Sequence, residues 1–334
     1  GAAHFLEHLA FKGTHSVGTS DYKKENKAIE ELDIAFQNWW DATQNGSSEA
    51  EVENLYGIFK EKQEYAAQYA VENEFGTIYE TEGGVGLNAY TSYDQTVYHL
   101  SLPSNKAELW CAMESDRIKN PVYRQLYKER EVIQEERLMR IDDNPSGFLN
   151  EEANSVFFKG HPYRDHIIGH MSEIQKLRRD DIRLFYETYY TPDNMTLCIV
   201  GDVEADEMFD MIDDYFGDIP APERSAERAR CVDAESRSEK RVTMYENARP
   251  YMLVSYQAPE ASHPDYIPLR LMMAILGNGR TSRLYTRMVT DEENAVYAGG
   301  FIRSQKYPSS LSFYLYPNTE IDAESLLVEL DEEI

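Results

Sequence analysis

Residues 1–14 read GAAHFLEHLAFKGT, and the five letters HFLEH within this stretch decide how the rest of the sequence is interpreted. No Gly or Pro interrupts the run from His4 to Phe11, so a helix is predicted there. His4, Glu7 and His8 stand at i, i+3 and i+4 and therefore project from one face of that helix. Two imidazoles one turn apart can reach a single zinc ion at about 2.0–2.1 Å, with the carboxylate beside the open coordination position. Taken alone, the same residues could also be surface histidines.

A catalytic zinc site needs a third protein ligand, and residues 128–140 (KEREVIQEERLMR) offer one. Glu129 and Glu136 are seven residues apart, so they share one helical face, with Val132 and Ile133 between them. Burying unpaired carboxylates is costly, whereas a coordinated carboxylate is a reasonable occupant of such a face. The alternative is a charged surface helix. The other carboxylates of this helix point elsewhere and are expected to be solvated: Glu131 and Glu135.

The remaining pattern predicts an α+β chain, because strands and helices do not alternate strictly. A helical hairpin is expected over 22–43 and 49–71, around the turn QNGSS, and two strands over 83–103. Further helices are expected at 107–119, 124–142, 146–158, 179–190, 205–216, 268–276 and 283–289. Further strands are expected at 195–203, 241–245 and 250–256. The Pro-, Ser- and Arg-rich stretch 217–239 is the expected linker.

Charge and composition exclude some classes of partner. The 334 residues carry 33 Lys and Arg against 60 Asp and Glu, a formal net charge of -27. Phosphate binding needs a positive footprint, so this balance argues against nucleic acids and anionic membranes. No apolar run of about 18 residues predicts a membrane span.

Cysteine usage and the chain ends give less information. Cys111, Cys198 and Cys231 show no metal-knuckle spacing and no disulfide framework, so they are interpreted as small buried hydrophobes, and the compartment stays open. The sequence starts without Met and stops at LLVELDEEI, within an expected helix. We therefore expect a fragment of a longer protein.

Five segments together resemble the pitrilysin family of zinc metallopeptidases, which includes insulin-degrading enzyme and mitochondrial processing peptidase. They are HFLEHLAFKGT, LNAYTSYDQTVYHLSLP, EREVIQEERL, HPYRDHIIG and YYTPDNMTLCIVGDV. HFLEH itself has the inverzincin order H-x-x-E-H. The resemblance covers nearly all of the first two thirds of the chain. It implies two related α+β domains, each a mixed sheet packed by helices. We expect them at 1–216, with the hairpin inserted at about 20–72, and at 240–334, the second being incomplete.

The resemblance also implies roles for individual residues. It makes His4, His8 and Glu136 the zinc ligands, Glu7 the catalytic base, and Glu129 a carboxylate that orients a ligand. Family members bind substrate by adding it as a strand to a sheet edge, here at residues 86–92. The matching substrate-binding residues are Asn88, Ala89 and Tyr90.

The sequence also departs from the family pattern. The strands that normally precede HFLEH are missing, and the hairpin makes the spacing to the Glu pair longer than in short members. A second half of the family's active site contributes an Arg and a Tyr seven residues apart. Here Tyr297 is present, but Thr290 stands where Arg is expected. We therefore expect a second homologous half or subunit to supply that pair.

These observations predict a metalloendopeptidase that hydrolyses peptides or unfolded polypeptides through a metal-bound water, with Glu7 as general base. Two alternatives stay open. One is a non-catalytic scaffold or chaperone-like subunit of the same fold, and the other is a structural zinc site, which would need a fourth protein ligand. A ligand set of nitrogen and oxygen atoms also accepts manganese or cobalt.

Overall fold

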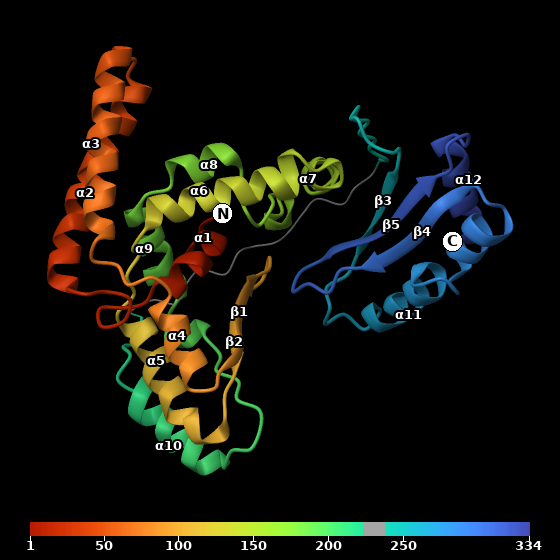
Figure 1. Cartoon of the computed structure of the whole chain (residues 1–334). Helices are drawn as coiled ribbons and strands as arrows, with labels where there is room; N and C mark the ends of the chain where they lie inside the picture. Colours follow the sequence, from red (N-terminus) through yellow and green to blue (C-terminus); the bar gives the residue numbers. More distant parts are fainter. Residues whose placement is uncertain (223–237) are drawn as a thin grey trace. The chain divides into compact units, whose positions relative to one another are not determined.

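A computed structural model describes residues 1–222 and 238–334 (Figure 1). Most of the expected linker 217–239, and Cys231, lie outside the described residues. The chain divides into two compact units: Gly1–Arg137 with Ile167–Arg228, and Leu138–His166 with Ala229–Ile334. Residues 138–166 thus group with the later part of the chain, whereas the expected first domain ran continuously to residue 216. That division into domains stays a prediction.

The first unit is mainly helical. Its α-helices are α1 (Ala2–Leu9), α2 (Tyr22–Gln44), α3 (Glu49–Ala67), α4 (Glu74–Thr81), α5 (Ala107–Lys119), α6 (Leu126–Arg137), α8 (Met171–Lys176), α9 (Arg179–Tyr189) and α10 (Ala205–Phe216). Short 3-10 turns lie at η1 (Ala10–Lys12), η2 (Ser104–Lys106) and η5 (Pro192–Asn194). The helix expected over 124–142 consists of α6 followed by a π-helical turn, η3 (Leu138–Asp142).

Helices α2 and α3 form the predicted antiparallel hairpin and lie side by side in Figure 1. Each helix begins at a capping side chain: Asp21 accepts a hydrogen bond from the amide of Lys24, and Ser48 accepts one from the amide of Glu51. Phe36 of α2 stacks on Tyr127 of α6 with ring centroids 4.5 Å apart. The hairpin therefore packs against the helix that carries Glu129 and Glu136.

A two-stranded antiparallel sheet completes the first unit. Strands β1 (Val85–Thr91) and β2 (Thr96–Ser101) pair with Thr91 opposite Thr96, around the predicted turn near residues 93–94. A register shift lies between Val85 and Asn88. In the described part of the chain β1 pairs with no strand other than β2, so its second edge has no strand partner there.

The second unit contains a three-stranded antiparallel sheet in the order β3-β5-β4. Its elements are η3, α7 (Pro145–Phe157), η4 (Pro162–Arg164), β3 (Met252–Ala258), α11 (Tyr266–Gly277), π-helix η6 (Tyr285–Asp291), β4 (Ala295–Ile302), β5 (Ser309–Pro317) and α12 (Ala323–Glu333). Phe313 and Leu315 of β5 are fully buried against Leu326 and Leu330 of α12. Helix α11 approaches β4 closely because Gly277 lacks a side chain: a Cβ there would lie 2.4 Å from the amide nitrogen of Gly300.

The predicted α+β class is confirmed, with two differences of detail. The described strands pair only antiparallel, whereas mixed sheets were expected. The segments 195–203 and 241–245 are not strands, and Val200 is 90% exposed. An apolar β-branched run becomes a strand only beside a hydrogen-bonding neighbour, and in the described residues these two segments have no such strand partner. None of the described helices combines the length and the apolar composition needed to cross a bilayer.

Candidate metal centre

Helix α1 presents the HFLEH residues on two faces. Phe5, Leu6 and Leu9 are buried at 2% exposure or less and anchor the helix in the first unit. The imidazoles of His4 and His8 lie together on another face, with ring centroids 4.8 Å apart. The apolar residues of α1 thus fix the direction in which both imidazoles point.

Glu136 meets both imidazoles from α6. Its Oε2 lies 3.5 Å from His4 Nε2 and 3.4 Å from His8 Nε2. Ligand atoms held at 2.0–2.1 Å around a tetrahedral zinc are about 3.3 Å apart, so these two separations fit such an ion. The potential ligand atoms of His4, His8 and Glu136 all lie within 4.8 Å of one another. In the described residues this is the one such group of His, Cys, Asp and Glu, and its donor set of two nitrogens and one carboxylate suits zinc.

Glu129 contacts His8 at Nδ1, the imidazole nitrogen that does not face Glu136. Its Oε2 is 3.5 Å from His8 Nδ1, and its Oε1 is 2.5 Å from Lys12 Nζ. Burial alone would raise the pKa of Glu129, but hydrogen bonds from His8 and Lys12 outweigh burial and hold that pKa below its usual range. A proton on His8 Nδ1 shared with Glu129 leaves Nε2 available as a ligand atom.

Glu7 is held by a residue that the sequence did not indicate. Thr91 Oγ1, at the end of β1, donates a hydrogen bond to Glu7 Oε2. Glu7 is partly exposed, so its carboxylate remains within reach of solvent. Strand β1 therefore contacts the candidate base through Thr91 and also carries the expected substrate-binding residues, Asn88 to Tyr90.

The inward face of α6 differs from the predicted one at three residues. Ile133 is buried and Glu129 is 6% exposed, as expected for the seam, but Val132 is 46% exposed. Two arginines are buried instead, Arg130 and Arg137, each 5% exposed. Arg137 Nη1 donates to the carbonyl of Gly169 over 2.6 Å, and Arg130 donates to the carbonyl of Leu177. These carbonyl acceptors explain why the two arginines can be buried.

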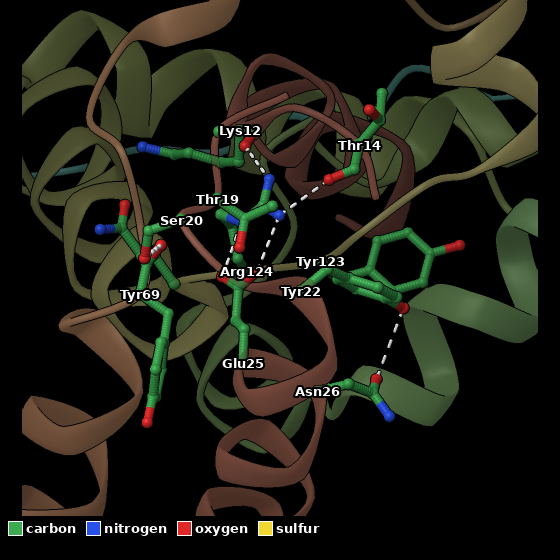
Figure 2. A network of polar contacts seen from close by, with 12 residues as sticks. Lys12, Thr14, Thr19, Ser20, Tyr22, Glu25, Asn26, Tyr69, Tyr123 and Arg124 are labelled. Atoms are coloured by element: carbon green, nitrogen blue, oxygen red, sulfur yellow. Dashed lines mark hydrogen bonds and ion pairs between the residues drawn. The ribbon is translucent and has the colours of Figure 1, made fainter. Parts of the chain in front are cut away.

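Arg124 holds the loop that follows α1, as Figure 2 shows. Its Nη1 donates to the carbonyls of Lys12 (2.5 Å) and Val17 (3.1 Å), and its Nη2 donates to that of Thr14 (2.8 Å). A Cβ at Gly13, whose φ is 93°, would lie 2.2 Å from the carbonyl oxygen of Val17, so this turn requires glycine. The loop that follows α1 is thereby attached to Arg124, two residues before the start of α6.

The expected substrate-binding residues lie on β1. Asn88 and Tyr90 are exposed and Ala89 is partly buried. The side chain of Asn88 accepts a hydrogen bond from the amide of Ala89 over 2.9 Å. The Tyr297 and Thr290 positions, where the family has its Tyr and Arg, belong to the other unit, in β4 and η6 respectively.

An α+β fold with two imidazoles and a carboxylate converging from two helices defines a candidate metal-dependent enzyme. A family model described as Insulinase (Peptidase family M16) matches residues 61–170, and one described as Peptidase M16 inactive domain matches residues 176–334. The chain belongs to peptidase family M16. The first match includes Glu129 and Glu136, whereas His4, Glu7 and His8 precede both matches.

Relatives and solved structures agree with this family. The chain is 27% identical to the zinc protease PqqE of Helicobacter pylori, over 77% of this chain and 59% of that protein. It is 26% identical to the mitochondrial-processing peptidase subunit beta of Lentinula edodes, over 86% of this chain and 52% of that protein. A crystal structure of a protease from Helicobacter pylori superposes with a TM-score of 0.79 at 23% identity, over 99% of this chain and 68% of that one. The chain thus spans little more than half the length of these two curated relatives.

Proposed function

We propose that this chain is the metal-binding part of a zinc-dependent endopeptidase that hydrolyses peptides or unfolded polypeptides. The observation that carries the proposal is the convergence of His4, His8 and Glu136, whose ligand atoms lie within 4.8 Å of one another. The names of the relatives support it, since two of them are a zinc protease and a processing peptidase. The model described as an inactive domain matches from residue 176 onward, and every residue of the proposed machinery precedes it.

Each residue of the site has a distinct task. When bound, zinc would lower the pKa of a water molecule toward about 7 and polarise the scissile carbonyl. Glu7 would accept the proton of the attacking water and pass it to the leaving amine. Glu129 would keep His8 in the correct tautomer and orientation. Lys12, 2.5 Å from Glu129, would keep that carboxylate ionised.

Substrate would bind by strand addition to β1. Backbone hydrogen bonds at a strand edge give affinity with little sequence preference, which suits varied or unfolded chains. Asn88, Ala89 and Tyr90 would line the added strand. Thr91 would hold the end of β1 beside Glu7. A second homologous half or subunit would supply the Arg and Tyr that this chain does not offer as a pair.

The proposal is tested by zinc analysis of the chain, together with cleavage of a mixed peptide library by the chain joined to its second homologous half, with and without chelator. Wild type should bind one zinc and cleave peptides, and chelator should abolish cleavage. Glu7→Gln should keep zinc and lose cleavage, while His4→Ala should lose zinc. Glu135→Gln, an exposed change on α6, is the matched control and should behave as wild type.

The outcomes separate the alternatives. Cleavage retained by Glu7→Gln would refute its role as the base. Zinc bound at one equivalent, with no cleavage by wild type in the presence of the second homologous half, would favour the non-catalytic scaffold. A structural zinc site is the less favoured alternative, because in the described residues the candidate group contains three ligands and not four.

A further inference from the structure

Two threonine hydroxyls connect Glu7 to the β1–β2 hairpin. Thr91 Oγ1 donates to Glu7 Oε2. Thr91 and Thr96 are opposite each other at the closed end of the β1–β2 hairpin, and their Oγ1 atoms are 3.2 Å apart. The base on α1 is therefore linked to both strands of the hairpin.

A pair of tyrosines stands beside Thr96. The hydroxyls of Tyr98 and of Tyr190, the residue directly after α9, are hydrogen-bonded, with their oxygens 2.8 Å apart. Tyr98 is two residues after Thr96 on β2, so both side chains lie on the same face of the strand. The strand that carries Thr96 is therefore tied to the end of α9.

The carboxylate fixes the direction of the two hydrogen bonds that involve Thr91. An ionised carboxylate only accepts, and each hydroxyl carries a single proton. Thr91 gives its proton to Glu7, so the bond between the two threonines must be donated by Thr96. Both threonine dipoles therefore point toward Glu7, and such an aligned pair strengthens each of its bonds.

Strand β2 is held rigidly beside Thr96. The guanidinium carbon of Arg117 lies 4.2 Å from the centre of the Tyr98 ring. The Tyr190 ring stacks on Tyr186 at 4.9 Å, and the Tyr186 hydroxyl donates to the carbonyl of Ile118 over 2.6 Å. These contacts fix the two tyrosines independently of Glu7, so β2 can act as a support for Thr96 and, through it, for Thr91.

We propose that Thr91, supported by Thr96, is a positioning residue that holds the carboxylate of Glu7 in its working rotamer. This inference rests on the proposed function of Glu7. The bond from Thr91 occupies Oε2, so Oε1 is the oxygen that would accept the proton of the attacking water. A base held within a fraction of an ångström of its working geometry raises the rate of the step, whereas a mobile one does not.

The test compares three variants of the chain, each joined to the second homologous half and loaded with zinc. Thr91→Val has nearly the same shape and lacks the hydroxyl, whereas Thr91→Ser keeps the hydroxyl. Thr43→Val, an exposed position in the α2–α3 hairpin, is the matched control. Thr91→Val should lower kcat about ten- to hundredfold, the effect of losing a hydrogen bond to a charged group, with KM and zinc content as in wild type. Thr91→Ser should stay within about threefold of wild type.

Crystal structures of the two Thr91 variants supply a readout that needs no turnover. The Glu7 carboxylate should leave its position in Thr91→Val and keep it in Thr91→Ser. Unchanged kcat in Thr91→Val, or an equal loss in Thr91→Ser, would overturn the inference, as would an unmoved Glu7 carboxylate in Thr91→Val. If wild type binds zinc without cleaving peptides, the proposed function fails, and the position of Glu7 alone still decides the role of Thr91.

Discussion

Arg124 and Glu25 form a buried two-point ion pair, in which Nε donates to Oε1 over 2.7 Å and Nη2 donates to Oε2 over 2.9 Å. The other three N–H groups of Arg124 donate to the backbone carbonyls of Lys12, Thr14 and Val17, so all five of its donors are used. Glu25 belongs to the helical hairpin, and Lys12 belongs to the 3-10 turn directly after α1. One side chain therefore attaches the hairpin and α1 to the start of α6.

Replacing Arg124 with Met should destabilise the protein by about 3–5 kcal/mol, because Glu25, 1% exposed, would be left as an unpaired buried charge. Urea unfolding of the first unit measures this loss. Arg183→Met is the control, since Arg183 pairs with Asp180 at the surface and such pairs contribute about 0–1 kcal/mol. Similar losses in the two variants would contradict the importance assigned to the buried pair.

The pH dependence of stability should contain a contribution from Asp116. This carboxylate accepts hydrogen bonds from Asn120 (2.7 Å), Ser16 (2.8 Å) and Thr14. Burial raises the pKa of Asp116, but these hydrogen bonds outweigh burial and hold that pKa below its ordinary value. A carboxyl group with a depressed folded-state pKa stabilises the protein above its unfolded-state pKa of about 3.9, and this stabilisation is lost as the pH falls through the folded value.

Asp116→Asn should therefore be less stable than wild type at pH 7, and the difference should shrink as the pH falls below about 4. Thermal unfolding between pH 7 and pH 3 measures it. Asp180→Asn, at an exposed position, is the control for a general effect of removing one negative charge. A difference that stays constant over this pH range would rule out the assigned role of the Asp116 carboxylate.

Zinc should stabilise the chain through the proposed site. A ligand that binds only the folded state adds about 2.7 kcal/mol at a free concentration of one hundred times its Kd. The midpoint of thermal unfolding of wild type and of Glu135→Gln should therefore rise on adding zinc and fall on adding chelator. His8→Ala and Glu136→Ala should show little of this response. An equal response in His8→Ala would place the bound metal somewhere else.

The parts of the site that depend on local spacing were predictable from the sequence. His4, Glu7 and His8 share a helix face because the helical period is fixed, and the seven-residue spacing of Glu129 and Glu136 sets them two turns apart. The helical hairpin was predictable as well, since its turn and capping residues are local signals. The exposed Glu131 and Glu135 agree with the same period.

The contacts that join distant segments could not be predicted in this way. Thr91 and Glu7 are 84 residues apart, and Arg124 and Glu25 are 99 apart, so no periodicity links them. The burial of Arg130 and Arg137 in place of Val132 also depends on carbonyl groups from another segment. Hydropathy places an arginine outside unless such acceptors are known.

The two described cysteines test a point on which the sequence and the structure disagree. The apolar run 195–203 predicted a buried strand around Cys198, and all cysteines were expected to be buried. In the structure Cys111 is buried and Cys198 is exposed. Burial, with a smaller contribution from the charge of Glu108, raises the pKa of the Cys111 thiol to about 11.

An alkylating reagent such as iodoacetamide should therefore modify Cys198 and spare Cys111 at pH 8, because only an accessible thiolate reacts. Peptide mapping by mass spectrometry reads each cysteine separately, so the result does not depend on Cys231. Urea should make Cys111 react as well, which controls for the detection of its peptide. Protection of Cys198 in the native protein would support the buried strand that the sequence predicted, because a thiol within a paired strand of the core is closed to the reagent. Rapid modification of Cys198 with Cys111 intact would instead support the exposed segment before α10 and the buried packing of α5.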